Sequence, residues 1–163
     1  MNWIPLNEIE YAYVWEKFNK HLKFNPSINK KDWPSFKEPK PFITYDISPA
    51  FRFPNMINDF DKNVIKALQE CISDGEYIYA LDWQHECYWY NPYLESPCNN
   101  FGDQPIPFFP NGDYYCFLQK DFEWGLLGHP WEQTICIFGN QLINATTNHK
   151  PQMFDKILRS YLD

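Results

Sequence analysis

The stretch YIYALDWQHECYWY, residues 77–90, decides the fold. Its first half, YIYALDW (77–83), alternates along the chain, so that one face of the strand it predicts carries Tyr77, Tyr79, Leu81 and Trp83. CYWY (87–90) has the composition of a second strand, and QHE (84–86) supplies the turn between them. A strand that returns after so short a turn pairs antiparallel with its predecessor. The stretch therefore predicts an antiparallel sheet.

Further strands are expected on both sides of this hairpin. TICIF (134–138) is the clearest buried strand, because it is short and, apart from Thr134, apolar. Similar patterns occur at FITYDI (42–47), DYYCFL (113–118) and WGLLG (124–128). After TICIF, Gly139 and Asn140 favour a tight turn, and QLINA (141–145) is then expected to return as a hairpin partner.

Three segments have the period of a helix. The first runs from about Glu8 to His21, with Asn7 as its N-cap and an apolar stripe formed by Tyr11, Val14, Trp15, Phe18 and Leu22. The second covers about Asp59 to Ser73, capped by Asn58 or Asp59 and ended by Gly75. The third begins at about Pro151, and the residues expected to face the core are Met153, Phe154, Ile157, Leu158 and Tyr161.

The order of these elements predicts the fold class. Consecutive strands with short turns form a mostly antiparallel sheet, and the N-terminal, central and C-terminal helices pack on it. We expect them to cover one face. A length of 163 residues fits one domain, so the sequence predicts a single α+β domain spanning residues 1–163.

Composition limits the partners and the compartment. The net charge is −7 and the pI is about 5.0, which argues against binding to nucleic-acid phosphates. The five cysteines (Cys71, Cys87, Cys98, Cys116 and Cys136) include no C-x-x-C pair. The chain has no secretory signal pattern and no apolar run of roughly 18 residues. We expect a cytoplasmic protein with reduced thiols, without membrane association and without a cofactor.

The segment GHPWE (128–132) allows two interpretations. Pro130 favours the first position of a helical turn, which puts His129 near the cap and lets Glu132 reach back to free backbone N–H groups. Trp131 then packs under the turn. In the functional interpretation His129 and Glu132 are a general base and its orienting carboxylate, or two metal ligands. We favour the architectural interpretation.

A second polar cluster, Asp82, His85 and Glu86, lies at the first hairpin turn. Asp82 can be a turn-forming residue beside an exposed His85, and this is the simpler interpretation. In the alternative, Asp82 and His85 meet His129 and Glu132 in space and form a catalytic site, with or without a divalent ion. These four are the catalytic candidates, and no metal site is predicted.

Aromatic residues make up 20% of the chain, and many of them surround a proline-rich loop at residues 91–112. A ring-rich core beneath a covering loop accounts for them. The functional alternative is an aromatic-lined groove for a peptide, a sugar or a protein. Its candidate binding residues are Trp89, Tyr90, Tyr93 and Trp131.

Three sequence blocks carry a resemblance. YALDWQHECYWY (79–90), PNGDYYCFL (110–118) and FEWGLLGHPWEQTICIFG (122–139) together resemble a bacterial family of uncharacterised proteins, domain of unknown function 2716. The resemblance extends back to VWEKFNKHLKFNPS (14–27) and DWPSFKEP (32–39). It implies a bacterial protein and carries over no activity, substrate or catalytic residue.

Two functions from different classes follow from these observations. The first is a small non-catalytic binding domain whose acidic surface suits a basic protein or peptide, for example an immunity or antitoxin-like protein that neutralises a toxin. The second is a hydrolase-like enzyme that uses Asp82, His85, His129 and Glu132. It requires these side chains to face one pocket.

Overall fold

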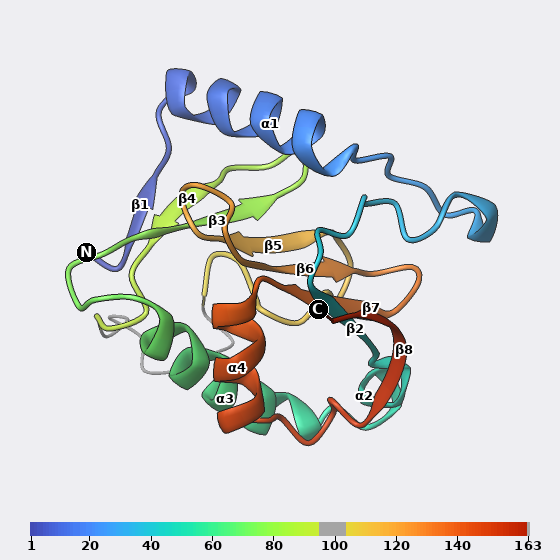
Figure 1. The fold of residues 1–163 in the computed structure, drawn as a ribbon. Coiled ribbons are helices and arrows are strands. Elements are labelled where there is room, and N and C mark those ends of the chain that lie inside the picture. Colours follow the sequence, from blue (N-terminus) through green and yellow to red (C-terminus); the bar gives the residue numbers. More distant parts are fainter. Residues whose placement is uncertain (95–103, 163) are drawn as a thin grey trace.

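An eight-stranded antiparallel sheet forms the centre of the computed structural model, which describes residues 1–94 and 104–162. The strands lie in the order β1-β4-β3-β5-β6-β7-β2-β8 (Figure 1). Their bounds are β1 Trp3–Pro5, β2 Phe42–Asp46, β3 Ile78–Asp82, β4 Tyr88–Tyr90, β5 Tyr115–Leu118, β6 Gly125–His129, β7 Thr134–Phe138 and β8 Lys156–Tyr161. The predicted α+β class and the hairpin of β3 and β4 are confirmed.

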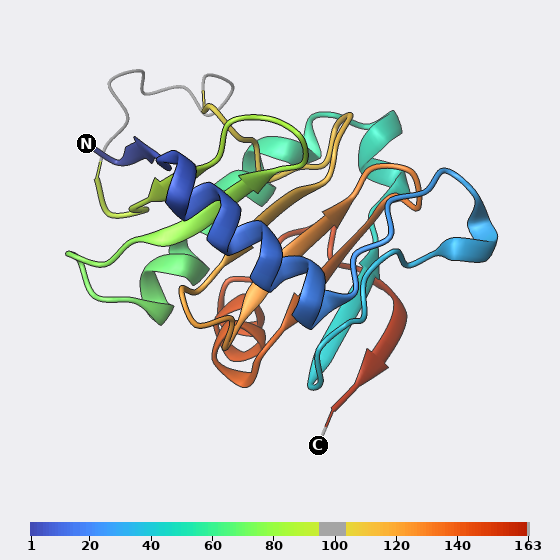
Figure 2. The ribbon, with the colours of Figure 1, turned by 90° about the horizontal axis from the view of Figure 1, so that it is seen from above.

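Helices lie on both faces of this sheet. The described residues form α1 (Glu8–Leu22), α2 (Ser48–Arg52), α3 (Met56–Cys71), α4 (Asn140–Asn148) and the short 3₁₀ helix η1 (Lys30–Asp32). Helix α1 crosses one face, whereas α3 and α4 lie side by side on the other (Figures 1 and 2). The expectation that all helices cover one face is wrong, because both faces of the central strands are apolar and each needs a cover.

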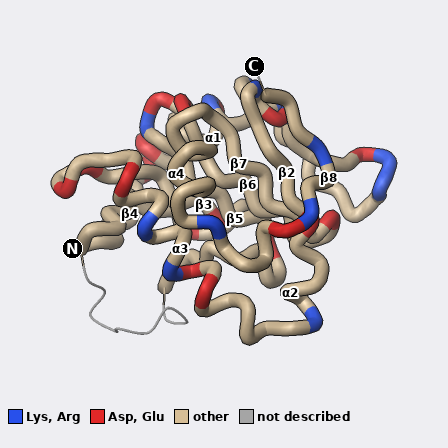
Figure 3. The backbone as a smooth tube through the Cα atoms, turned by 60° about the horizontal axis from the view of Figure 1, so that its bottom comes forward, with Lys and Arg blue, Asp and Glu red and all other residues tan. Residues whose placement is uncertain are grey.

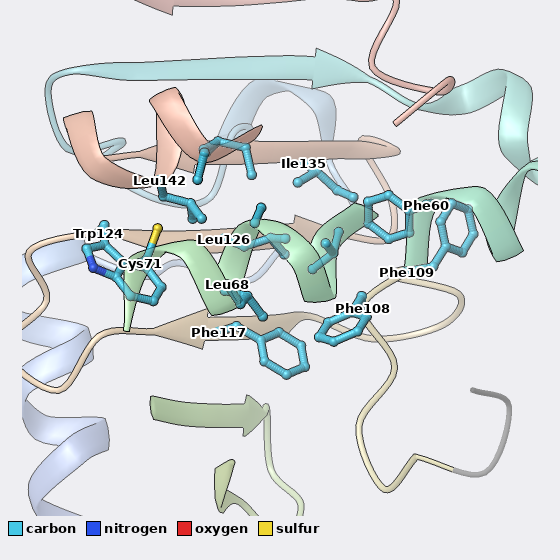
Figure 4. Close-up of a cluster of buried hydrophobic side chains, with 14 of the residues drawn as sticks. Phe60, Leu68, Cys71, Phe108, Phe109, Phe117, Trp124, Leu126, Ile135 and Leu142 are labelled. Carbon is cyan, nitrogen blue, oxygen red and sulfur yellow. The ribbon is translucent and has the colours of Figure 1, made fainter. Parts of the chain in front are cut away.

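Alternation along the strands produces two core layers. Ile78 and Ala80 of β3 point into the layer under α3 and α4, where Phe60, Leu68, Phe117 and Trp124 pack together (Figure 4). Tyr79 and Leu81 point the other way, toward Phe18 and the rest of the apolar stripe of α1. The central strands are therefore buried on both sides, whereas the edge strand β8 is largely exposed.

Asn7 caps the N-terminus of α1, as predicted. The Asn7 side chain accepts a hydrogen bond from the Glu10 backbone N–H at 2.8 Å, and the Glu10 carboxylate accepts one from the Asn7 N–H at 3.0 Å. This reciprocal pair is a capping box, which satisfies two backbone donors that would otherwise lack partners.

Two C-terminal predictions are wrong. Residues 141–145 do not return as a strand but belong to α4, in which the buried Leu142, Ile143 and Thr146 have helical spacing. Gly139, at φ +87°, sends the chain away from the sheet, and a β-carbon there would overlap the Glu123 carbonyl oxygen and Trp124.

Residues 156–161 are not a helix either. They form β8, which pairs with β2 at the edge of the sheet with an irregularity beside Thr44 and Tyr45. Met153 and Phe154 are buried in the preceding turn. The apolar spacing fits a helix, but the free edge of β2 offers main-chain partners to an extended chain.

The central helix also starts earlier than expected. α3 begins at Met56, with Asn55 at its N-cap instead of Asn58 or Asp59, and ends at Cys71, before Gly75. The short helix α2, which begins beside Pro49, was not predicted. None of the helices in the described ranges is long and apolar enough to cross a membrane.

Candidate functional site

Asp82, His85 and Asp113 form a cluster at one end of the sheet, called here the Asp82–His85–Asp113 cluster. His85 Nδ1 lies 3.0 Å from Asp82 Oδ1 and 3.2 Å from Asp113 Oδ2. Three ligating atoms, one from each residue, lie within 4.8 Å of one another. Asp82 and His85 lie together, as the alternative interpretation of the sequence required, but Asp113 was missed as their partner.

Local structure explains this meeting. Asp82 ends β3 and pairs with Tyr115 of the neighbouring strand β5, so Asp113 lies just before β5 at the same end of the sheet. The backbone N–H of His85 donates to the Asp82 carbonyl at 3.1 Å and closes the turn that follows β3. The signal for Asp113 was present in the sequence, as an acidic residue directly before a strand expected beside β3.

The electrostatics of the cluster are unusual for a surface turn. The side chains of Asp82 and Asp113 are only 16% and 19% exposed, whereas the imidazole of His85 is 64% exposed. Burial and the neighbouring Asp113 raise the pKa of Asp82 to about 6. Hydrogen bonding to Asp82 raises the pKa of His85. Within residues 1–94 and 104–162, no Lys or Arg forms an ion pair with either carboxylate.

His129 lies elsewhere, buried at the end of β6. Its Nδ1 accepts hydrogen bonds from the backbone N–H groups of Trp131 at 3.2 Å and Glu132 at 3.0 Å. Because Nδ1 accepts, the ring proton belongs on Nε2, which donates to Ser35 Oγ at 2.9 Å. Burial lowers the pKa of His129 to about 4. The imidazole itself therefore caps the turn.

Two other predicted details of this turn are wrong. The Glu132 side chain does not reach back to the backbone, because it accepts hydrogen bonds from Arg159 at 2.8 and 2.9 Å and from Thr134. Trp131 is 53% exposed and does not pack under the turn. The sequence showed no local sign of Arg159, which comes from the distant strand β8.

Glu38 completes this second polar network. It accepts hydrogen bonds from Arg159 Nε at 2.9 Å and from the Thr44 hydroxyl. Glu38 and Glu132 are both nearly buried, and the one guanidinium holds both carboxylates. The network fixes β8 to the sheet. It also leaves His129 and Glu132 outside the Asp82–His85–Asp113 cluster, so the four catalytic candidates do not share one set of ligating atoms.

The four aromatic candidates do not form one surface. Trp89 and Tyr90 are neighbours on β4 and so face opposite sides of the sheet. Trp89 stacks on Tyr79, with ring centroids 4.3 Å apart, whereas Tyr90 stacks on Trp3 in the other layer. The Tyr93 hydroxyl donates to the Ile72 carbonyl at 3.1 Å. Part of the proline-rich loop, residues 95–103, lies outside the described residues.

Trp89 nevertheless lines a groove of about 410 Å³, called here the Trp89 groove. The groove lies where β1, β3 and β4 meet the turn after β5, and its lining residues are Ile4, Ile72, Gly75, Glu76, Tyr77, Ile78, Trp89, Gln119 and Lys120. Trp89 Nε1 donates to Glu10 Oε2 at 2.8 Å. With the stack on Tyr79, this bond fixes the indole ring in the lining.

None of the described thiols is suited to act as a catalytic nucleophile. Cys71, Cys87, Cys116 and Cys136 are free and buried. Burial raises the pKa of Cys87 to about 11 and raises the pKa of the others as well. A thiol held in its protonated form is a poor nucleophile.

Comparison with known proteins agrees with the resemblance. Residues 5–143 match a family model described as "Protein of unknown function (DUF2716)". The chain is also 36% identical over 161 residues to "Uncharacterized protein YxiI" of Bacillus subtilis (strain 168), an alignment that covers 94% of this chain and 98% of that protein. No solved structure matches the chain significantly. The protein therefore belongs to the DUF2716 family.

Proposed function

We propose that the protein is a non-catalytic binding domain and that the Trp89 groove is its recognition surface. The observation that carries this proposal is the fixed indole of Trp89 in an open groove of about 410 Å³. Binding sites commonly combine an apolar lining with a few polar groups, and a ring that is already held in place loses little entropy on binding.

The hydrogen bonds of the catalytic candidates His129 and Glu132 support binding over catalysis. The imidazole of His129 is engaged at both nitrogens, and the Glu132 carboxylate is held by Arg159. These bonds serve the fold. A general base needs a free acceptor within reach of a substrate, and neither residue offers one.

The charge of the chain favours a basic partner. The net charge is −7, and acidic and basic residues are interspersed along the described chain without a basic stripe (Figure 3). The groove combines apolar and aromatic side chains with Glu76 and Lys120. We propose that a basic protein places an apolar side chain against Trp89 and Ile4 and a cation near Glu76. Immunity- or antitoxin-like neutralisation of a toxin is one activity that such binding would serve.

Gly75 provides a sharp test of the groove. A β-carbon at this position meets no atom within 4 Å, so Gly75→Arg is expected to fold and to place a long side chain in the groove. The matched control is Asn144→Arg, an exposed position on α4. Tagged wild type and both variants would capture proteins from an extract of the host, with quantitative mass spectrometry and a salt series.

The expected result is a basic protein that is captured by the wild type and by Asn144→Arg but not by Gly75→Arg. Its purified form should bind with a dissociation constant that increases with salt. For the toxin version, co-expression of the wild type but not of Gly75→Arg should relieve the toxicity of that partner. Equal capture by all three proteins would rule out the groove as the recognition surface.

A hydrolase-like enzyme is the second candidate, because Asp82 and His85 do lie together, with Asp113 as their third member. An exposed imidazole held by two carboxylates could act as a general base. The test is a panel of p-nitrophenyl esters and phosphates with and without Mn²⁺. Turnover by the wild type that is lost in Asp113→Asn would favour the enzyme, whereas equal rates in both proteins would exclude it for these substrates.

A further inference from the structure

We propose that the Asp82–His85–Asp113 cluster binds one divalent transition-metal ion, Zn²⁺ or Mn²⁺, through Asp82 Oδ1, His85 Nδ1 and Asp113 Oδ2. The cluster offers one nitrogen and two oxygen ligands, a combination that suits these ions better than the all-oxygen shells preferred by Ca²⁺ and Mg²⁺. The proposal does not depend on the Trp89 groove, which lies at the opposite end of β3.

The spacing of the ligating atoms fits a single ion. Bonds of about 2.1 Å from a metal to nitrogen and oxygen ligands place two ligands at a right angle about 3 Å apart. The separations from His85 Nδ1 are 3.0 Å to Asp82 Oδ1 and 3.2 Å to Asp113 Oδ2. An ion can therefore be held with small side-chain movements, and three protein ligands leave further positions for water.

The carboxylates are already oriented by the backbone. Asp113 Oδ1 accepts a hydrogen bond from the backbone N–H of Tyr114 at 2.8 Å, and this bond turns Oδ2 toward His85. Asp82 and Asp113 are placed by neighbouring strands of one sheet, and the turn after β3 fixes His85. Such outer contacts keep metal ligands in position before the ion arrives.

Charge provides an independent argument. Arg159 pairs with the poorly exposed Glu38 and Glu132, and Lys156 pairs with Asp46, whereas the buried Asp61 has no ion pair among the described residues. Asp82 and Asp113 have only the imidazole of His85. These two carboxylates lie close together and are poorly exposed, and a bound cation would offset their repulsion.

The test is metal binding by untagged, EDTA-treated protein. Mn²⁺ is titrated by the loss of the free-ion signal in electron paramagnetic resonance, and Zn²⁺ is titrated by calorimetry. The variants are Asp113→Asn and His85→Gln. The matched control is Glu70→Gln, which alters a second surface pair of a histidine and a carboxylate, with His149 Nε2 at 3.3 Å from Glu70 Oε1.

We expect one ion per chain in the wild type and in Glu70→Gln, with affinity lowered at least about tenfold in Asp113→Asn and in His85→Gln. Circular dichroism in EDTA checks that each variant is folded. Because the His85 side chain is 64% exposed, His85→Gln keeps the test valid even if Asp113→Asn unfolds. The proposal fails if the wild type binds neither ion below about 1 mM, or if folded variants bind as tightly as the wild type.

Discussion

His129 illustrates at the scale of one residue how a buried imidazole can be entirely structural. Its two nitrogens contact Ser35 and the backbone of the next turn, and its ring lies against Tyr114 at 4.8 Å between centroids. A proton added to Nδ1 would meet two N–H donors instead of an acceptor. The neutral form is therefore required by the fold, whatever the protein binds.

This requirement predicts a loss of stability in acid. The pKa of His129 is about 4 when folded and near 6.5 when unfolded, so its contribution is complete above pH 6.5 and falls as the pH drops toward 4. His129→Asn keeps an acceptor for the turn but does not titrate. Urea unfolding from pH 4 to 7 should show the wild type losing about 3 kcal/mol relative to the variant. A pH-independent difference would contradict this account.

Asp61 predicts the opposite pH dependence. Burial on α3 raises the pKa of its carboxyl from 3.8 to about 7. The folded protein then favours the protonated form, and stability falls as the pH rises from about 4 through 7. Asp61→Asn should gain up to about 4 kcal/mol relative to the wild type between pH 4 and pH 8, measured by urea unfolding. A flat difference over this range would show that Asp61 ionises freely in the folded state.

At the scale of elements, strand β8 depends on the network of Arg159 with Glu38 and Glu132. Arg159→Met should lower the free energy of unfolding by about 3 kcal/mol or more, because two poorly exposed carboxylates lose their cation. The control is Lys156→Met on the same strand, whose largely exposed ammonium pairs with Asp46 at 3.6 Å, a contact worth at most about 1 kcal/mol. Equal effects in the two variants would refute the anchoring role of Arg159.

Helix α1 should depend on its N-cap. Asn7→Ala removes the acceptor for the Glu10 N–H and should cost about 1 kcal/mol of stability. Asn7→Ser keeps an acceptor oxygen and should restore most of this loss. Thermal unfolding of the two variants side by side provides the measurement, and a shift of the same size for both would contradict the capping box.

At the scale of the whole molecule, the sheet between two apolar layers should unfold as one unit. Cys116 of β5 and Cys136 of β7 are both buried in the layer beneath α1. We expect a thiol reagent to label both at one rate, the rate of global unfolding, as followed by peptide mass spectrometry. Denatured protein provides the fast control. Faster labelling of either residue would reveal local opening of the sheet.

Much of this architecture was accessible from local pattern. The hairpin at residues 77–90, strand β7 and helix α1 were predicted because their periodicity and turn residues agree with their final state. The sequence also placed Asp82 and His85 at the turn of this hairpin, and the structure pairs their side chains. In these segments the contacts that fix the local structure are made between residues close in sequence. The sequence alone therefore determined the antiparallel sheet and the apolar face of α1.

The tertiary structure decided the conformation of the C-terminal segment and the position of Asp113. Residues 156–161 have helical apolar spacing but extend along the free edge of β2, where main-chain hydrogen bonds and the Glu38–Arg159–Glu132 network outweigh local preference. Asp113 joins Asp82 and His85 only because β5 lies beside β3. Partners separated by 27 to 121 positions in the chain leave no periodic signal, since only the folded sheet brings them within hydrogen-bonding distance.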